Sequence, residues 1–491
     1  MTAMTLLLAL CGSAHAEDTE TGWSTTGELR ELLSTGTDFE VDADGTTIGQ
    51  GAHLDQRLRV GASHKGFITH FETEWDLFTG QLAGDTWDIA RSGDERRRDV
   101  HGALTLGGLQ PRKLSVGGYV GNADVEIGLM TSHWGLGLVA NDGDHQPLFG
   151  REDFGDRVLR AKVTMLPWKT RVGAAAPTFI VLAVDTVFAD DLALLSEGQV
   201  ANQAVAAILH DPGEDATKWG LYGVFRNQLE PGMERATQAG VLDAFGSHPI
   251  ELNDELTLTL AAESVGIMGR TSRAQSYNAT DGLALRSGAL VTKATLESPR
   301  FDAHLNLGAS SADGRPDDKR SLDFTADRDF GVGMVLFDEV MGGIDAGTHS
   351  LLTDPVYSGQ APDGVELVAN EGAWRRAAYI QPAIAVRPID QLELKVGMVS
   401  AISTGPIAQP FYSFRNGGVP RNHLNQDTAG KRGLGNEINW ALSLQPKSTE
   451  VMEEEWKVQP RLEIQGGHAM LGEALGGGTV SLVQSALRVD W

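Results

Sequence analysis

The chain ends with residues 479–491, which read TVSLVQSALRVDW. Counting back by twos from Trp491 gives a mostly apolar set, whereas the other phase carries polar or charged side chains such as Arg488 and Asp490. Alternation with a period of two is typical of a β-strand between an apolar and a polar environment. An aromatic residue at the last position is unusual, because chain termini are normally frayed and polar. The stretch predicts the final strand of a membrane β-barrel or of a soluble β-protein, and the rest of the chain has to distinguish the two.

The first residues predict export. An apolar run is followed at residues 14–16 by Ala-His-Ala, the small-x-small pattern of a cleavage site. We therefore expect a secretory signal peptide over residues 1–16 and a single domain over residues 17–491. Cys11 does not predict a lipid anchor, because the leucine directly before it is a poor match to such a site.

Composition excludes several functional classes. The only cysteine lies in residues 1–16, so the expected mature chain can form neither a disulfide framework nor a thiolate zinc site. The formal net charge of −26 argues against nucleic acid as a partner, because phosphate binding requires clustered Lys and Arg. No later run approaches the roughly 18 apolar residues of a membrane helix. A barrel strand needs only about 10 residues with alternate positions facing lipid. A mean hydropathy of −0.17 is therefore compatible with a membrane barrel.

Alternating segments separated by glycine-rich turns recur along the whole chain. They predict an all-β, antiparallel, up-and-down transmembrane β-barrel of about 16 strands, within a range of about 14 to 18. Residues 179–188 are apolar on both faces and therefore ambiguous, and helix-like spacing in residues 190–210 predicts a loop with a short helix. The predicted strands cover residues 27–33, 53–62, 67–77, 113–120, 125–134, 157–166, 219–228, 240–245, 255–268, 288–296, 301–309, 331–341, 374–386, 391–401, 433–444, 458–465 and 479–491.

Connections of two lengths join these segments. Short turns are expected at residues 63–66, 121–123 and 387–390, and long polar segments at residues 79–98, 139–156, 189–216, 342–373 and 404–431. Outer-membrane barrels show this asymmetry, with short periplasmic turns and long external loops.

The whole of residues 17–491 resembles bacterial outer-membrane porins. Residues 131–143, TSHWGLGLVANDG, and residues 434–438, LGNEI, resemble an uncharacterised porin-like family of deltaproteobacterial, myxobacterial type, and the second stretch is also similar to alginate-export-type porins. The resemblance implies a location in the outer membrane of a Gram-negative cell, with membrane lipid as a partner. It also implies that Trp491 belongs to the signal read by the barrel-assembly machinery. It leaves open whether the protein forms a homo-oligomer, and it brings no known substrate.

Charged side chains recur on the polar phase of the predicted strands, so a barrel would turn them toward its lumen. The acids and bases nearly balance, so the wall itself predicts no strong ion selectivity. A channel for passive diffusion of small hydrophilic solutes is the function expected, and a structural or surface barrel with a plugged lumen is the alternative. The predicted lumen-lining residues are Arg57, Arg59, His70, Glu72, Glu74, Asp76, Arg160, Lys162, Glu263, Glu393, Lys395, Glu437, Arg461 and Glu463.

Residues 132–156 form the sharpest local feature. A glycine-spaced run, WGLG, leads into a series of oxygen-bearing side chains that could hold calcium in an external loop, although the spacing of an EF-hand is absent. The other readings are an acidic loop that faces water and a loop that folds into the lumen and constricts it. The candidate calcium ligands are Asp142, Asp144, Glu152, Asp153 and Asp156.

Sequence motifs of enzymes are absent. The chain contains no G-x-S-x-G, no H-E-x-x-H and no phosphate-binding loop of the Walker type, so we expect no catalytic residues. A lipid hydrolase embedded in the barrel remains the less favoured alternative, with Ser132 and His133 or His304 as its candidates. A histidine on the water-facing side of a strand is far more often an ordinary polar lumen residue.

Overall fold

The structure is a computed structural model, and it describes residues 22–48, 51–84, 109–151, 155–166, 178–213, 216–230, 235–273, 279, 281–315, 318–353, 372–447, 449–451 and 456–491. The predicted signal peptide at residues 1–16 lies outside the described residues, as do the candidate calcium ligands Glu152 and Asp153.

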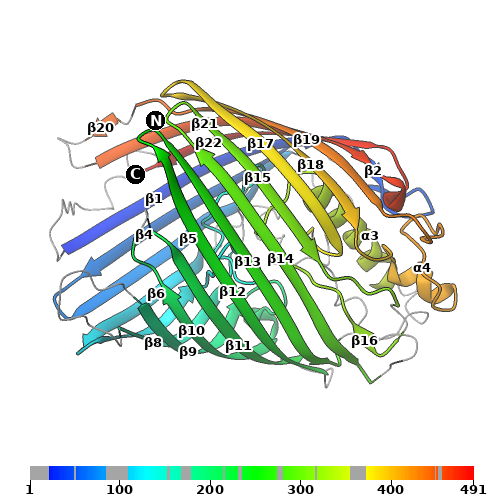
Figure 1. The fold of residues 1–491 in the computed structure, drawn as a ribbon, viewed down its shortest axis with the longest axis horizontal. Coiled ribbons are helices and arrows are strands. Elements are labelled where there is room, and N and C mark those ends of the chain that lie inside the picture. The colour runs from blue at the N-terminus through cyan, green and yellow to red at the C-terminus, as the bar shows by residue number, and fades with distance from the viewer. Residues whose placement is uncertain are drawn as a thin grey trace.

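Eighteen strands form one closed barrel, and each strand runs antiparallel to its two neighbours (Figure 1). The prediction of an antiparallel up-and-down barrel is therefore confirmed, with the strand number at the upper end of the expected range. The barrel strands are β1 (Gly22–Gly36), β4 (His53–Lys65), β5 (Thr69–Gly84), β6 (Leu109–Val120), β7 (Ala123–Thr131), β8 (Arg157–Met165), β9 (Thr178–Ala189), β10 (Val200–His210), β11 (Lys218–Glu230), β12 (Arg235–Asn253), β13 (Leu256–Thr271), β14 (Leu283–Glu297), β15 (Phe301–Ser310), β17 (Ala377–Ile389), β18 (Leu392–Ser403), β19 (Gly433–Leu444), β21 (Trp456–Leu471) and β22 (Thr479–Asp490).

Shorter elements accompany the barrel. The strand pair β2 (Phe39–Glu40) and β3 (Thr47–Ile48) follows β1, and β16 (Arg320–Ser321) and β20 (Thr449–Val451) each pair with a barrel strand. The helical elements within the described residues are η2 (Leu195–Glu197), the π-helical turn η3 (Leu336–Met341), α3 (Gly342–Thr353), α4 (Pro410–Arg415) and η5 (Glu473–Leu475). Among the described residues, no helix is both long enough and apolar enough to cross a membrane.

The last strand closes the barrel against the first. In the antiparallel pair of β1 and β22, Glu28 lies opposite Asp490 and Gly36 lies opposite Leu482. Beyond the end of β22, the Trp491 N–H donates to the Gly27 carbonyl at 3.0 Å, and the Gly27 N–H donates to the Trp491 carbonyl at 2.9 Å. The indole ring lies over Gly27 so closely that a Cβ there would stand 2.1 Å from the ring. A glycine at position 27 therefore makes room for the terminal tryptophan.

The two ends of the barrel differ in their connections. Residues 66–68, 121–122, 254–255, 298–300 and 390–391 are short turns at the end where the chain terminates. Residues 132–156, 311–376 and 404–432 are long connections at the opposite end, where α3 and α4 lie (Figure 1). The asymmetry predicted for periplasmic turns and external loops is therefore present.

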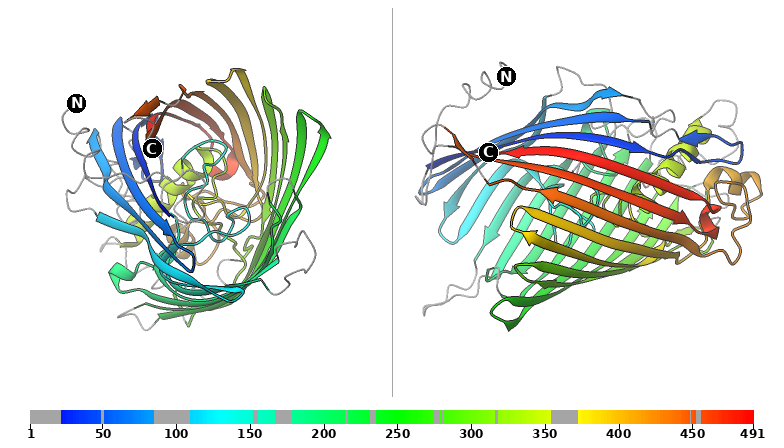
Figure 2. Two further views of the ribbon diagram at one scale, coloured as in Figure 1. Left: turned by 90° about the vertical axis from the view of Figure 1, so that its left-hand side faces the viewer. Right: turned by 90° about the horizontal axis from the view of Figure 1, so that it is seen from above.

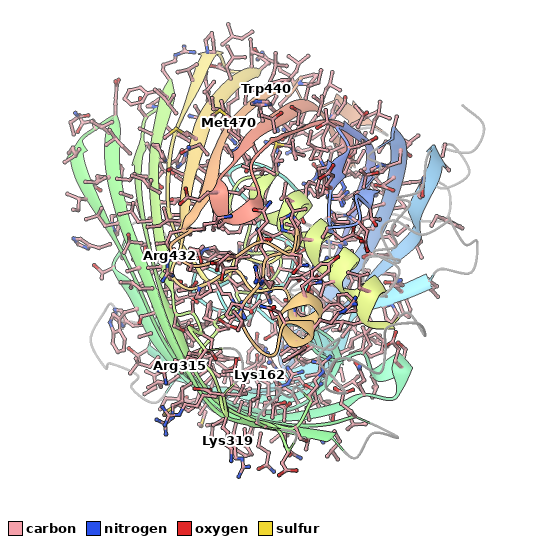
Figure 3. All side chains as sticks on the ribbon, turned by 90° about the vertical axis from the view of Figure 1, so that its right-hand side faces the viewer. Lys162, Arg315, Lys319, Arg432, Trp440 and Met470 are labelled. Atoms are coloured by element: carbon pink, nitrogen blue, oxygen red, sulfur yellow. The ribbon has the colours of Figure 1, made fainter. Side chains whose placement is uncertain are left out.

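Apolar side chains cover the outer face of the wall. Val184 on β9, Leu242 on β12 and Met268 on β13 expose 62, 66 and 71% of their surface. In Figure 3, which looks into the barrel from the end where α3 and α4 lie, Trp440 and Met470 project from the outer side of the wall. An apolar exterior on a closed barrel suits the hydrocarbon of a membrane, because each described barrel strand pairs with a neighbour on both sides and no open sheet edge faces the lipid.

The largest apolar cluster lies inside the barrel. Phe330, Met334 and Trp374, all from the connection between β15 and β17, pack with the wall residues Val265 and Val291. In Figure 2, left, this connection and the one between β7 and β8 occupy the space enclosed by the strands. The protein therefore stabilises its lumen with a hydrophobic core as well as with polar contacts.

Two strand assignments from the sequence are wrong. Residues 190–210 were expected to form a loop with a short helix, and residues 189–216 a long external segment. The short helix is present as η2 (Leu195–Glu197), but β10 (Val200–His210) is a full barrel strand. Its inner face carries Val205 and Ala207, which pack against Trp134 of the connection inside the lumen. Both faces of β10 are therefore apolar, and the alternation that marks a strand is lost.

Residues 331–341 were expected to form a wall strand. They instead lie inside the barrel, where residues 336–341 form the π-helical turn η3 that leads into α3. This run is apolar because it forms much of the interior core, not because it faces lipid. The strand expected at residues 240–245 does exist but is much longer, as β12 (Arg235–Asn253).

Candidate functional site

The lumen is narrowed by two connections that fold inward from the long-loop end. We call residues 132–151 the first inserted segment and residues 311–376, as far as they are described, the second inserted segment. The first segment reaches two separate parts of the wall, because the Leu138 N–H donates to Glu263 of β13 at 3.3 Å and the Gly150 N–H donates to Gln465 of β21 at 3.0 Å. The Gln465 side-chain amide also donates to the Gly150 carbonyl at 2.9 Å, so one side chain holds both polar groups of that residue.

A buried carboxylate on β13 anchors the first segment. Glu263 is fully buried, and its carboxylate accepts hydrogen bonds from the backbone N–H groups of Leu136 and Leu138. Gly135 lies so close that a Cβ would stand 2.5 Å from Glu263 Oε2. On the next strand, Asp243 accepts from Trp134 Nε1 at 3.1 Å. The two acids therefore fix the turn that begins the segment.

A second buried carboxylate anchors the second segment in the same way. Glu437 on β19 is fully buried, and it accepts from the N–H groups of Met334 at 2.7 Å, Val335 at 3.0 Å and Leu336 at 2.7 Å. These N–H groups begin the helical run η3–α3 and would otherwise lack acceptors. A carboxylate at a helix N-terminus also interacts favourably with the helix dipole.

Two arginines of the wall hold the middle of the first segment. Arg59 Nη1 lies 2.7 Å and Arg112 Nη2 lies 2.8 Å from the same oxygen, Asp144 Oδ1. Arg112 Nη2 also donates to the Asp142 carbonyl at 2.9 Å, and its Nε donates to Glu74 at 2.8 Å. Arg59 donates in addition to Asp76 at 2.7 Å. The segment is therefore fixed to β4, β5 and β6 by charge-assisted hydrogen bonds.

The two inserted segments also bind one another. The Asn141 N–H donates to Asp327 Oδ2 at 3.1 Å, and the Asp327 N–H donates to the Leu138 carbonyl at 2.9 Å. Burial and the neighbouring carboxylate of Asp156 raise the pKa of Asp327 well above its ordinary value. Burial, followed by the carboxylates of Asp190 and Asp191, does the same to the pKa of Asp156. Protonated carboxyls are therefore favoured where the two segments meet.

Several predicted lumen-lining residues on β4, β5 and β8 contact oppositely charged side chains of other strands. Arg57 contacts Glu28 at 2.7 Å, Lys162 contacts Glu126 at 2.6 Å, and Arg160 contacts Asp185 at 2.8 Å. Glu72 lies 3.1 Å from Lys113, and His70 Nδ1 lies 3.8 Å from Asp124. The first four contacts join adjacent strands and form ladders of opposite charge, whereas His70 on β5 and Asp124 on β7 lie on either side of β6.

The predicted residues on β18 and β21 meet the far end of the first segment. Lys395 Nζ donates to the Leu148 carbonyl at 3.3 Å, and it lies 3.6 Å from Glu393. Arg461 Nη1 donates to Gln146 Oε1 at 3.2 Å, and the Gln146 amide lies 3.5 Å from Glu463. Glu263 and Glu437 differ from this set, because both are buried beneath an inserted segment and bind its backbone instead of facing open lumen.

Two cavities flank the inserted segments. A cavity of about 410 Å³ lies toward the long-loop end and has Arg226, Arg273 and Asp323 in its lining. A second cavity of about 350 Å³ lies toward the short-turn end, and its polar lining is His145, Lys293, Thr295, Asp302, His304, Asn306, Gln381, Glu393 and Lys395, with Asn141, Gln146 and Asp329. Asp327 lines the first cavity and Asp329 the second, so the boundary between them is the contact between the two segments.

Of the candidate calcium ligands, the three that the structure describes, Asp142, Asp144 and Asp156, do not converge on one point. Asp144 is bonded to two arginines, and Asp142 accepts a hydrogen bond from the ring of His145 at 2.9 Å. Burial opposes ionisation of Asp142, but the His145 hydrogen bond and the Asp144 N–H outweigh it and lower the pKa of Asp142 to about 2. Asp156 lies elsewhere, at the contact with the second segment.

The residues named for a lipid hydrolase are also separated by their contacts. Ser132 Oγ accepts a hydrogen bond from Arg160 Nη2 at 3.3 Å, whereas His133 turns toward Asp142 and His145. His304 lines the second cavity from β15.

Sequence reasoning missed Arg112, Lys293 and Asp327. Arg112 breaks the alternation of β6, because the register shifts there: Lys113 lies opposite Glu74 and Pro111 opposite Trp75. This β-bulge turns the Arg112 side chain inward, where 1% of the residue surface is exposed. Lys293 stands on the polar phase of a strand that was predicted, so alternation could have found it. No sequence pattern marks Asp327, because its role arises only when the two segments meet.

Comparison with known proteins bears on the fold. No protein-family model and no curated protein sequence matches the chain. Several solved structures match the fold. OccAB1 of Acinetobacter baumannii matches with a TM-score of 0.52 and 9% identity, covering 96% of each chain. The outer membrane protein OprD from Pseudomonas aeruginosa matches with a TM-score of 0.52 and 10% identity, covering 96% of this chain and 94% of that one. OccK9 (OpdG) of the same organism matches with a TM-score of 0.51 and 9% identity, over 96% of this chain and 97% of that one. The chain thus has the fold of a porin-like outer-membrane β-barrel.

Proposed function

We propose that the protein is an outer-membrane channel through which small hydrophilic solutes diffuse passively. The observation that carries the proposal is the pair of cavities on the two sides of the inserted segments, both bounded by charged and polar side chains within one closed barrel. The apolar exterior supports a location in a lipid bilayer, and the fold shared with outer-membrane porins supports the outer membrane in particular.

The proposal includes the parts of the chain that direct it there. Residues 1–16 act as the signal peptide, residues 17–491 form the barrel, and Trp491 is read by the assembly machinery before it closes against Gly27. The predicted wall residues surround the solute path, except Glu263 and Glu437, which hold the segments that narrow it. The likeness to the deltaproteobacterial family and to alginate-export-type porins stays a prediction, as does a homo-oligomer.

A barrel with a plugged lumen is the second candidate function. The apolar core around Trp374 favours it, because this core and the hydrogen bonds between the two segments fill the middle of the lumen. The two candidates differ in one measurable respect: whether water-filled space connects the two cavities.

Site-specific thiol modification tests this directly, because residues 17–491 contain no native cysteine. The variant Thr295→Cys places a thiol in the second cavity, and Leu305→Cys on the neighbouring strand places one on the outer face, where that leucine exposes 39% of its surface. Both are reconstituted in liposomes, and sugar uptake is measured before and after treatment with a charged, water-soluble thiosulfonate.

A channel predicts uptake that falls with increasing sugar size and that the reagent reduces in Thr295→Cys but not in Leu305→Cys. Absence of uptake by a barrel that still shows heat-modifiable migration would establish the plugged alternative. Uptake that neither thiol affects would show that solutes do not pass through the second cavity.

A further inference from the structure

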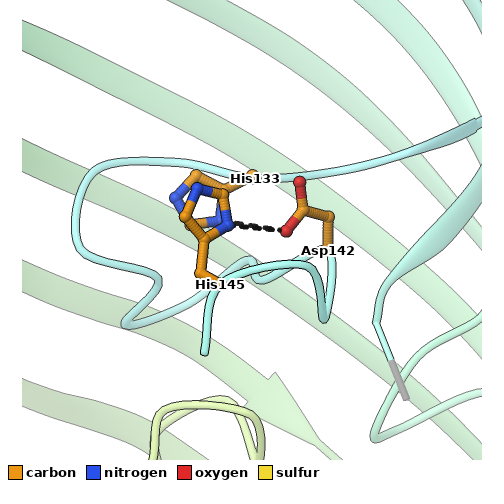
Figure 4. A group of neighbouring side chains, drawn as sticks. All are labelled: His133, Asp142 and His145. Atoms are coloured by element: carbon orange, nitrogen blue, oxygen red, sulfur yellow. Dashed lines mark hydrogen bonds and ion pairs between the residues drawn. The ribbon is translucent and has the colours of Figure 1, made fainter. Parts of the chain in front are cut away.

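Three potential metal ligands meet in the first inserted segment. His133, Asp142 and His145 lie around a common point, shown in Figure 4, and one ligand atom from each lies within 4.8 Å of the other two. Asp142 Oδ1 is 2.9 Å from His145 Nδ1 and 3.6 Å from His133 Nδ1. The two imidazole rings stack, with their centroids 3.9 Å apart.

The fold of the segment brings these residues together. Gly135 and Gly137 adopt positive φ angles of 59° and 83°, and the turn they form returns the chain so that the Trp134 N–H donates to the Ala140 carbonyl at 3.1 Å. His133 therefore faces the residues that follow Ala140. Glycine is needed for such backbone angles, because other residues rarely adopt them.

The surroundings also fix the ligands in place. Arg112 holds the Asp142 carbonyl, and the Asp144 N–H donates to Asp142 Oδ1 at 3.1 Å. The buried Nδ1 of His133 has no hydrogen-bond partner and lies 3.6 Å from Asp142 Oδ1. A histidine that ligates a metal typically uses one ring nitrogen for the metal, and in His133 this nitrogen faces the other two ligands.

The donor set selects a class of metal. Imidazole nitrogens suit zinc, copper and nickel, whereas calcium requires six or more oxygen ligands. Zinc–ligand bonds of about 2.0–2.2 Å place tetrahedral ligand atoms roughly 3.4 Å apart. The distances from Asp142 Oδ1 to His145 Nδ1, 2.9 Å, and to His133 Nδ1, 3.6 Å, lie on either side of that value. Stacked rings cannot both direct a lone pair at one ion, so one ring must turn. His145 exposes 60% of its side chain and has room to do so.

We infer that His133, Asp142 and His145 form a site for a divalent transition-metal ion, of which Zn²⁺ is the representative. The site is reached from the lumen, because His145 lines the second cavity. With three protein ligands, the ion keeps a fourth position for water or for a solute donor. It also joins the two arms of the first segment at the second cavity. This inference is independent of whether the protein conducts.

Titration calorimetry of the refolded chain in detergent, without an affinity tag, tests the site with Zn²⁺. The wild type is expected to bind one ion, and His133→Ala, Asp142→Asn and His145→Ala are each expected to weaken binding at least tenfold. His304→Ala, in the same cavity, and His70→Ala, in a second group of histidine and carboxylates, are the controls and should bind as the wild type does.

Cobalt(II) supplies a second readout, because coordination by imidazole gives visible absorption that the His145→Ala variant should lack. Correct folding of each variant is checked by its heat-modifiable migration in gels. The inference is overturned if folded His145→Ala binds zinc as tightly as the wild type, if either control weakens binding equally, or if calcium displaces zinc at comparable concentration.

Discussion

Replacement of Glu437 by glutamine isolates the anchor of the second inserted segment. The carboxylate accepts three backbone hydrogen bonds, from Met334, Val335 and Leu336, and no part of the residue is exposed. Glutamine has nearly the same size but only one acceptor oxygen, and its NH₂ group would face an N–H donor. The substitution therefore changes hydrogen bonding and charge while leaving the packing volume almost unaltered.

The expected cost follows from these contacts. One hydrogen bond to a charged acceptor is lost, and one buried N–H is left without a partner, so the insertion is destabilised by about 3 kcal/mol. Since each 1.4 kcal/mol corresponds to a factor of ten, local opening of residues 334–336 becomes on the order of 100-fold more frequent. The barrel itself remains closed, because its strand pairs do not involve this carboxylate.

Hydrogen exchange measured by mass spectrometry reports the opening directly. Amides of residues 334–341 should exchange on the order of 100-fold faster in Glu437→Gln, whereas those of β22 should be unchanged. Glu72→Gln is the matched control, because Glu72 lies in the same lumen with 45% of its side chain exposed. Equal protection of residues 334–341 in the wild type and Glu437→Gln would refute the anchor, as would the same acceleration in the control.

The remaining predictions concern the closure, the segment contact and the arginine anchor. Gly27→Val should displace the Trp491 ring, because a Cβ at position 27 would stand 2.1 Å from that ring. The barrel should then unfold in gels, as seen by its heat-modifiable migration, at a lower temperature than the wild type. An unchanged temperature would contradict the packing of Trp491 on Gly27. Asp156→Asn should stabilise the first segment, and the stabilisation should grow as the pH rises from about 4 through the raised pKa of Asp156. Over that range only the wild type acquires a further negative charge near Asp190. Hydrogen exchange rates at several pH values test the sign, and a difference that does not depend on pH would refute the reasoning. Arg112→Met should destabilise the first segment by about 3 kcal/mol, since it removes the charge-assisted hydrogen bonds to Glu74, to Asp144 and to the Asp142 carbonyl, although Arg59 still binds Asp144. Limited proteolysis within residues 140–151 should therefore accelerate, and unchanged cleavage would contradict the anchor.

Alternation predicted the parts of the wall whose two faces meet different environments. β8 (Arg157–Met165), β18 (Leu392–Ser403) and β19 (Gly433–Leu444) lie within about two residues of their predicted bounds. Their outward side chains are apolar and their inward ones include charges, so the period of two is visible. The glycine-rich turns and the terminal aromatic residue completed the prediction of a closed barrel.

The failures occur where the lumen is not filled with water. β10 (Val200–His210) packs its inner face on Trp134, and residues 331–341 lie in the interior core, so neither stretch has the polar phase that a water-filled barrel requires. A run of apolar residues does not reveal whether it faces lipid or a plug. Only the position of the inserted segments, which depends on contacts between distant parts of the chain, explains both errors.

The functional residues were predictable by position but not by role. Alternation placed Glu263 and Glu437 on the inward phase, yet their partners are backbone N–H groups about a hundred or more residues away along the chain, and such donors carry no signature in the sequence. Arg112 was hidden by a bulge that inverts the phase of its strand locally. His133 and His145 are close because of a glycine turn whose geometry the sequence alone does not specify.

Single-channel recording of residues 17–491 in a planar lipid bilayer tests the central claim most directly. If the two inserted segments narrow the lumen but leave it open, discrete conductance steps are expected. The size and noise of these steps should increase when Glu437→Gln loosens the second segment. Correctly folded barrels that give no steps in either form would contradict the claim and establish a sealed lumen.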